Sequence, residues 1–266
     1  MELVDSIITP PLKYTPLNNW RDLGGFAVSG GVIRSGVIWR SDDPSTVPAA
    51  DADDLVRRGL TDVIDLRSSR ESDRTGRGPL QAHEVAYHRV SLLKGKEEPG
   101  SLRRHIEAGT GTPDVVGRGY ADRVIADAGS LVGGYAIIAG AAGATLVHCA
   151  AGKDRTGFFI ATLLAFLGAS DHDIVADYAI SELKIAAIMR RVTGSIGYLL
   201  DAEDHFRAVI SSTDPVEPLI GAHPDSMKAM LDCLREAGGI RSILTAGGMT
   251  PELEAQLRDR IVKVDK

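Results

Sequence analysis

The stretch from Leu146 to Phe159 reads Leu-Val-His-Cys-Ala-Ala-Gly-Lys-Asp-Arg-Thr-Gly-Phe-Phe. A short apolar run of strand length, Thr145 to His148, leads into it, and an apolar run of helical length, Thr156 to Leu167, leaves it. Cys149 and Arg155 are separated by five residues, so one loop can hold a nucleophilic sulfur at its start and a guanidinium at its end. The backbone N–H groups of such a loop can converge on one anion. The stretch therefore predicts a buried strand, a phosphate-binding loop and the start of a central helix.

Strand-like and helix-like segments alternate along the chain up to residue 167. The segments that look regular are the Gly-punctuated strands of 15–42, a helix over 51–59, strands over 61–67 and 84–93, and a helix over 119–139. Two polar segments, 68–74 and 94–113, are expected to be loops. The alternation predicts an α/β fold of three layers, with a mostly parallel central sheet flanked by helices.

The last hundred residues carry a helical pattern. Helices are expected over 170–191, 225–237 and 240–246 and from Thr250 onward, packed on the side and top of the sheet. No linker or repeat interrupts the chain, so residues 1–266 are expected to form a single domain. The uncharged segment 131–147 is interrupted by glycines, which favours a helix, a turn and a strand over a membrane span.

Composition restricts the class of partner and the compartment. The net charge of −6 gives no general attraction for nucleic acid, so a phosphorylated ligand must be captured by local positive charge. The two cysteines, Cys149 and Cys233, form neither a disulfide framework nor a zinc pattern, and we expect no metal and no cofactor. A reactive thiol suits a reducing compartment and residues 1–11 lack a secretory pattern, which together predict a cytoplasmic location. Oligomeric state leaves no signal in the sequence.

Phosphate ester cleavage needs a nucleophile, stabilisation of the phosphoryl charge and a proton for the leaving oxygen. Cys149 lies at a helix N-terminus close to Arg155, and both features favour its thiolate form. Arg155 has the planar fork that binds two phosphate oxygens, and Gly152 permits a sharp turn close to the anion. The residues expected to contact substrate are Ala150, Ala151, Gly152, Lys153, Asp154, Arg155 and Thr156.

Two neighbours of the nucleophile have expected supporting roles. The Thr156 hydroxyl can reach the sulfur, and the His148 ring can bond nearby backbone and hold Cys149 in position. Because successive strand residues point to opposite faces, His148 is not expected to shuttle protons. The alternative interpretation of the loop is structural: a buried cysteine and a surface arginine in a glycine turn.

The string from His148 to Gly157 resembles the catalytic loop of protein tyrosine phosphatases, in particular the bacterial branch with Lys-Asp in that loop. Further segments look like the same branch, namely 19–25, 39–41, 61–71 and 173–178. The resemblance implies hydrolysis through a phosphocysteine on Cys149, with phosphotyrosine proteins as substrates. It also implies tolerance for phosphoserine, phosphothreonine and phosphoinositides, which is tied to Lys153 as a second cation. Helical elements within 194–224 are then expected to form either a lid or an ordinary cap on the core.

The chain departs from the better-known tyrosine phosphatases because it has no Trp-Pro-Asp tripeptide to supply the acid. Some lipid phosphatases with a similar loop aspartate are thought to use that residue, so Asp154 is our candidate general acid. The alternative role for Asp154 is to order the loop by binding backbone N–H groups.

Charged residues at other strand ends are candidate supporting residues. Asp65 and Arg67 end one strand, and Arg40 and Ser41 end another, so a role beside the loop and simple ion pairing are both open. Adjacent Arg21 and Asp22 are expected to pair with each other.

Two other functions use the same loop. An arsenate reductase or sulfurtransferase would bind another oxyanion, but the relay cysteines of such enzymes are missing. A non-catalytic module that binds phosphorylated ligands would normally have lost Cys149 or Arg155, and both are present.

Overall fold

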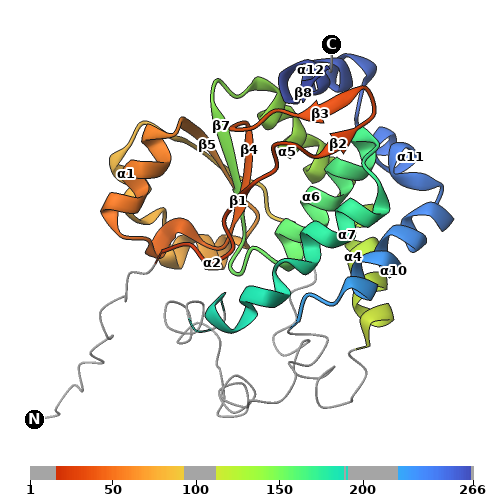
Figure 1. Cartoon of the computed structure of the whole chain (residues 1–266), viewed down its shortest axis with the longest axis horizontal. Helices are drawn as coiled ribbons and strands as arrows, with labels where there is room; N and C mark the ends of the chain where they lie inside the picture. The colour runs from red at the N-terminus through yellow and green to blue at the C-terminus, as the bar shows by residue number, and fades with distance from the viewer. Residues whose placement is uncertain (1–15, 93–111, 189, 191–220, 265–266) are drawn as a thin grey trace, which may run out of the picture.

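The computed structural model describes residues 16–92, 112–188, 190 and 221–264 (Figure 1). The expected loop over 94–113 lies outside the described residues except at its last two positions, and the candidate lid over 194–224 except at its last four. Within the described residues, no helix is both long and apolar enough to cross a membrane.

A mostly parallel sheet forms the centre, as the alternation of elements predicted. Its strands run in the order β1 (Arg21–Asp22), β4 (Ile38–Ser41), β7 (Ala144–His148), β5 (Leu60–Asp65) and β6 (Ala86–Arg89). The three inner pairings, β4 with β7, β7 with β5 and β5 with β6, are parallel, and only β1 runs antiparallel to its neighbour. A small antiparallel sheet joins β2 (Ala27–Val28), β3 (Gly31–Ile33) and β8 (Val262–Lys263).

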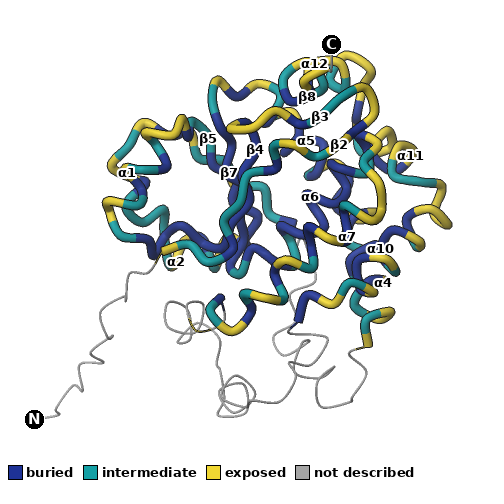
Figure 2. The backbone as a smooth tube through the Cα atoms, viewed as in Figure 1, coloured by how far each residue is buried: buried dark blue, intermediate teal, exposed yellow. Residues whose placement is uncertain are grey.

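Alternating side chains of the central strands fill two separate cores. Trp39, Val63 and Leu146 pack on one face, and Ile38, Ile64 and Val147 pack on the other. Each strand therefore contributes to both cores, which is the pattern of a parallel sheet covered on both faces. Strands β4, β5 and β7 are accordingly buried along most of their length (Figure 2).

Helices cover both faces of the sheet and make it the middle of three layers (Figure 1). The first face carries η1 (Pro44–Thr46), α1 (Ala49–Arg57), α2 (Ser69–Thr75) and η2 (Gly78–Ala82). The other face carries the larger helical group, which consists of α4 (Pro113–Ala126), α5 (Ala128–Gly140), α6 (Asp154–Leu167), α7 (Asp171–Ala179), η3 (Glu182–Lys184), α10 (Pro224–Glu236), α11 (Gly239–Ala246) and α12 (Pro251–Ile261). Of these, α6 is buried along nearly its whole length and lies at the centre, as expected.

Two expectations about local structure were wrong. The segment expected as a polar loop forms α2, because Ser68 caps it and Glu71 reaches back to the Ser68 backbone in a capping box. The single helix expected over 119–139 is two helices, α4 and α5, that meet at Asp127, the cap residue of both.

Candidate functional site

The carboxyl ends of the parallel strands line up at one edge of the sheet. Ser41, the last residue of β4, pairs with His148, the last residue of β7. Asp65, the last residue of β5, pairs with His148 and also with Arg89, the last residue of β6. The loop that follows His148 therefore leaves the sheet where three other strands end, the usual position of a ligand site in α/β folds.

The loop turns sharply at Gly152. Its backbone has a φ of +66°, and a Cβ placed there would lie 2.3 Å from the Ser41 carbonyl oxygen. Only glycine fits, because both the left-handed conformation and the contact with β4 exclude a side chain. The turn brings residues 150–155 over the ends of the strands.

Side chains from the N-terminal region hold the outer side of this loop. The Arg40 Nη2 group donates to the Gly152 carbonyl oxygen at 2.7 Å, and the Asn19 Nδ2 group donates to the Ala151 and Gly152 carbonyl oxygens at 3.1 and 3.0 Å. Among the described residues, the backbone N–H groups of Ala150, Ala151 and Gly152 donate to no protein group. Loop N–H groups without a protein acceptor are the groups that bind anions in anion-binding loops.

A buried carboxylate secures the arginine that holds the loop. Asp177 on α7 bonds Arg40 through Oδ2, and through Oδ1 it accepts from Arg21 Nε at 2.7 Å. Burial alone would raise the pKa of Asp177, but the two guanidinium groups lower it, and the residue stays charged. The expected pairing of Arg21 with Asp22 was wrong, since neighbouring strand residues point apart and Asp22 instead accepts from two glycine N–H groups.

The nucleophile candidate and the loop arginine both lie inside this frame. Cys149 is buried, with 2% of its surface exposed. Arg155 forms a two-point ion pair with Glu71 of α2, with Nη1 to Oε2 at 2.6 Å and Nη2 to Oε1 at 2.8 Å. Burial raises the pKa of the Glu71 carboxyl, but the bonds from Arg155 and Ser68 outweigh burial and bring it to about 2. The pair therefore remains charged throughout the neutral range.

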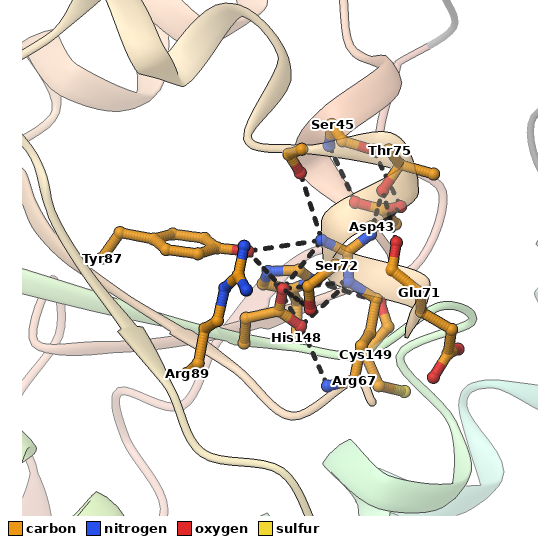
Figure 3. Close-up of polar contacts among 12 residues, drawn as sticks. Asp43, Ser45, Arg67, Glu71, Ser72, Thr75, Tyr87, Arg89, His148 and Cys149 are labelled. Atoms are coloured by element: carbon orange, nitrogen blue, oxygen red, sulfur yellow. Dashed lines mark hydrogen bonds and ion pairs between the residues drawn. The ribbon is translucent and has the colours of Figure 1, made fainter. Parts of the chain in front are cut away.

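The candidate supporting residues Asp65 and Arg67 bond each other in a buried polar cluster. Figure 3 shows Arg67 in this cluster, close to Asp43, Ser72 and His148. Arg67 Nη1 donates to Asp43 Oδ2 at 2.5 Å, and its Nη2 donates to Asp65 Oδ2 at 2.7 Å. Ser72 Oγ donates to the same Asp65 oxygen at 2.8 Å, and the Tyr87 hydroxyl also donates to it. Burial opposes the charge on Asp65, but His148 when protonated and Arg67 hold the pKa of this carboxyl far below its usual range.

His148 contacts the loop in the way expected of a structural residue. Its Nδ1–H group donates to the Cys149 carbonyl oxygen at 3.1 Å, and its Nε2 atom lies 3.9 Å from Asp65 Oδ1. Burial lowers the pKa of His148, so the ring is neutral at pH 7 and Arg67 is then the charged partner of Asp65. The ring thus bonds the backbone of Cys149, the candidate nucleophile.

The Lys-Asp pair of the loop has partners of its own. Lys153 is 3% exposed, and its Nζ group donates to the Gly221 carbonyl oxygen at 3.0 Å and lies 3.1 Å from Asp154 Oδ1. Asp154 begins α6 and has a side chain that is 44% exposed. The Tyr120 hydroxyl donates to Asp154 Oδ1. The contacts of this carboxylate with described residues are made by side chains, and its alternative role of ordering the loop stays a prediction.

The Thr156 hydroxyl is buried and bonds no described residue, so its expected contact with the sulfur is not made here and stays a prediction. No group of three or more His, Cys, Asp or Glu side chains in the described part of the chain is arranged to hold a metal ion.

From the sequence alone, no role in the site was assigned to several residues that contact the loop or Arg40, among them Asn19, Glu71, Tyr120 and Asp177. The Ser-x-x-Glu spacing of the capping box could have placed Glu71 at a helix start facing the loop. Asn19 and Asp177 fall in segments that resemble the same family branch as the loop, but no local pattern shows that these two residues or Tyr120 belong to the site.

The sequence of this chain is similar to those of several known proteins. Residues 12–263 match the model of the tyrosine phosphatase family. A putative tyrosine-protein phosphatase of Cupriavidus necator is 36% identical over 172 residues, which cover 63% of this chain and 61% of that protein. The triple specificity protein phosphatase PtpB of Mycobacterium tuberculosis is 30% identical over 207 residues, which cover 70% of this chain and 74% of that one.

A tyrosine-protein phosphatase of Nostoc commune is 33% identical over 143 residues, covering 53% of this chain and 47% of the relative. The match to the Cupriavidus protein likewise spans less than two thirds of that protein's length.

Proposed function

This chain belongs to the tyrosine phosphatase family, and from that premise we propose that it hydrolyses phosphoric monoesters through a phosphocysteine formed on Cys149. The observation that carries the proposal is the state of the loop backbone. The carbonyl groups of Ala151 and Gly152 are tied back by Asn19 and Arg40, while the N–H groups of the same loop bond no described protein group. The oxygens of a phosphoryl group beside Cys149 would accept hydrogen bonds from those N–H groups.

The first chemical step transfers the phosphoryl group to sulfur. The Cys149 thiolate attacks phosphorus, the P–O bond to the substrate breaks, and Asp154 donates a proton to the departing oxygen. The guanidinium of Arg155 and the loop N–H groups stabilise the negative charge on the equatorial oxygens in the transition state.

The second step returns the enzyme to its starting state. Water attacks phosphorus and gives its proton to Asp154, the S–P bond breaks, and inorganic phosphate leaves with the thiolate restored. The Thr156 hydroxyl is the group available to stabilise the sulfur at this point, since it is buried with no partner among the described residues. Atoms and charges then balance over the cycle without a metal or an organic cofactor.

When substrate binds, the Arg155 guanidinium must be shared between Glu71 and the phosphate. Both terminal nitrogens contact Glu71 in the described conformation, whereas a phosphate dianion needs two donors of the same guanidinium. Glu71 therefore either orients Arg155 while another edge of the guanidinium binds phosphate, or yields its place to the substrate.

We propose phosphotyrosine as the main substrate, with phosphoserine, phosphothreonine and phosphoinositides as further substrates. The name of the mycobacterial relative, a triple specificity protein phosphatase, favours a broad range. The phosphoinositide part depends on Lys153, whose ammonium lies buried against Asp154 and the Gly221 carbonyl oxygen. An inositol phosphate must therefore draw Lys153 away from these partners to use its charge.

Phosphate release from p-nitrophenyl phosphate by wild type and Cys149→Ser tests the mechanism. We expect turnover by the wild type and none by the variant, with a radiolabelled or mass-shifted phosphocysteine trapped in the wild type by rapid acid quenching. Turnover by Cys149→Ser equal to wild type would refute it. Binding without turnover in the wild type would instead identify a non-catalytic module, and arsenate reduction without phosphate release would identify the other oxyanion chemistry.

A panel of phosphopeptides and short-chain phosphoinositides at equal concentration ranks the substrates. We expect Lys153→Met to lower kcat/KM more for phosphoinositides than for phosphotyrosine peptides. An equal loss on both classes would remove Lys153 from substrate selection.

A further inference from the structure

We propose that Tyr120 is a positioning residue for Asp154: its hydroxyl, supported by Tyr178, holds one carboxyl oxygen so that the other presents the proton to the leaving group. This inference rests on the proposed function, in which Asp154 is the general acid.

Three elements of the larger helical group meet at this carboxylate. Tyr120 comes from α4 and Tyr178 from α7, while Asp154 is the first residue of α6. The Tyr120 hydroxyl donates to Asp154 Oδ1, and its oxygen lies 3.0 Å from the Tyr178 hydroxyl oxygen. The two tyrosine rings meet edge to face with centroids 6.2 Å apart. Both tyrosines are buried, whereas the Asp154 side chain reaches the surface of the site.

The direction of these hydrogen bonds follows from the chemistry of the groups. An ionised carboxylate only accepts, so the Tyr120 proton lies toward Asp154, and the Tyr120 oxygen is then left to accept from Tyr178. Burial and the negative charge of Asp154 raise the pKa of Tyr120 well above its usual value. Tyr120 therefore keeps its proton across the pH range in which a phosphatase is assayed, and the chain of donors is permanent.

The two oxygens of Asp154 are not equivalent in this arrangement. Oδ1 takes the Tyr120 hydroxyl and lies 3.1 Å from the Lys153 ammonium. No hydrogen bond from a described residue reaches Oδ2. A proton on Asp154 consequently resides on Oδ2, while the donors on Oδ1 hold the carboxyl plane in one orientation.

This arrangement stabilises the transition state more than the ground state. As Asp154 gives its proton to the leaving oxygen, negative charge grows on the carboxylate and both donors to Oδ1 strengthen. A fixed donor aimed at developing charge needs no reorganisation during the reaction. General acid catalysis as a whole is worth about 10²–10⁴-fold, so loss of one of its two supports is expected to cost on the order of tenfold.

The variant Tyr120→Phe tests the inference, with Tyr135→Phe as its matched control. Tyr135 is also buried, and its hydroxyl bonds the Phe159 carbonyl oxygen and the Thr162 hydroxyl, away from the loop. Each variant loses one buried hydroxyl, so the general cost in stability is shared, and urea unfolding checks this. The kinetic readout is kcat and KM on p-nitrophenyl phosphate, which has a good leaving group, and on an alkyl phosphate, which needs the acid.

We expect Tyr120→Phe to lower kcat on the alkyl phosphate about tenfold with little change in KM, and to change kcat on p-nitrophenyl phosphate by less than about threefold. Tyr135→Phe is expected to leave both substrates unaffected. In the Tyr120→Phe/Asp154→Asn double variant, the ratio of kcat on p-nitrophenyl phosphate to kcat on the alkyl phosphate should be no greater than in Asp154→Asn alone. This is expected because the two residues act as one unit. Tyr178→Phe should give a smaller effect in the same direction, and it serves in place of Tyr120→Phe if that variant does not fold.

The outcomes separate the inference from the function on which it rests. If Asp154→Asn is selective against the alkyl phosphate but Tyr120→Phe behaves like Tyr135→Phe, the positioning role is refuted and the acid stands. If Asp154→Asn slows both substrates equally, Asp154 is not the acid and the role of Tyr120 falls with it. The phosphocysteine mechanism is tested independently by Cys149→Ser.

Discussion

Replacing Glu71 by glutamine removes the charge that faces Arg155 while keeping the size of the side chain. Glu71 Oε2 accepts from the Ser68 N–H and hydroxyl at 2.9 and 2.8 Å, and both of its oxygens bind the Arg155 fork. The side chain is 24% exposed, so solvent screens the pair only in part. The substitution therefore tests how much one ion pair beside the loop contributes to the stability of the fold.

The magnitude follows from the pKa of this carboxyl, which falls from its ordinary 4.5 to about 2 in the folded chain. Each pKa unit is worth about 1.36 kcal/mol, so the charge of Glu71 stabilises the fold by roughly 3 kcal/mol at pH 7. Because the folded pKa is the lower one, this stability is present above about pH 4.5 and is lost as the pH falls toward 2. By pH 3.5, roughly 1.4 kcal/mol of it has been lost.

Urea unfolding of wild type and Glu71→Gln between pH 7 and pH 3.5 measures the effect. We expect Glu71→Gln to be less stable by roughly 3 kcal/mol at pH 7 and the difference to narrow steadily below pH 4.5. Asp173→Asn is the control, because Asp173 also bonds the N-cap serine of its helix but lies exposed, and this variant should change stability far less. A difference between wild type and Glu71→Gln that stays constant with pH would refute the reasoning.

Three further predictions concern the frame of the loop. Gly152→Ala must place a Cβ 2.3 Å from the Ser41 carbonyl oxygen at a positive φ. We therefore expect the free energy of unfolding in urea to fall by at least about 1–3 kcal/mol, with no measurable hydrolysis of aryl phosphate. Near-native stability would contradict the loop geometry. Asp177→Asn leaves Arg40 buried without its countercharge. We expect the free energy of unfolding at pH 7 to fall by about 3–5 kcal/mol. A fall of less than about 1 kcal/mol would show that the fold does not need this ion pair. Inorganic phosphate at about 100 times its Kd should stabilise the wild type by about 2.7 kcal/mol, which is measured as a higher Tm. It should leave the Tm of Arg155→Ala unchanged. An equal rise in Tm in both proteins would show that the anion binds elsewhere.

The sequence was sufficient where a local pattern decides the structure. The apolar run before Cys149 and the run after Thr156 predicted β7 and α6, and both were confirmed because burial on the two faces of a sheet and along a central helix imposes apolar residues at nearly every position. The alternation of such runs likewise predicted the mostly parallel sheet, which places the loop at the carboxyl ends of the strands.

Local pattern failed where a polar segment hides a helix or where partners are distant. In α2 the capping box outweighed a polar composition that suggested a loop. Arg21 bonds Asp177, which lies 156 positions further along the chain, and no pattern within a short window can reveal such a pair. The contact of Tyr120 with Asp154 is of the same kind, because it arises from the packing of α4 beside α6.

The dependence of the loop on residues 19, 40 and 177 has a consequence for how the protein is made. Asn19 bonds both Gly152 and Ser181, so the frame of the loop needs the segment before β1 and the segment after α7 at the same time. At about 5–20 residues per second, a ribosome takes roughly 1.5 to 6 seconds to extend the chain from Gly152 to Ser181. During that interval the thiol of Cys149 has been synthesised but the residues that frame its loop have not, so the nascent thiol lacks its native surroundings. We expect newly made protein to be the fraction most sensitive to irreversible oxidation of this cysteine.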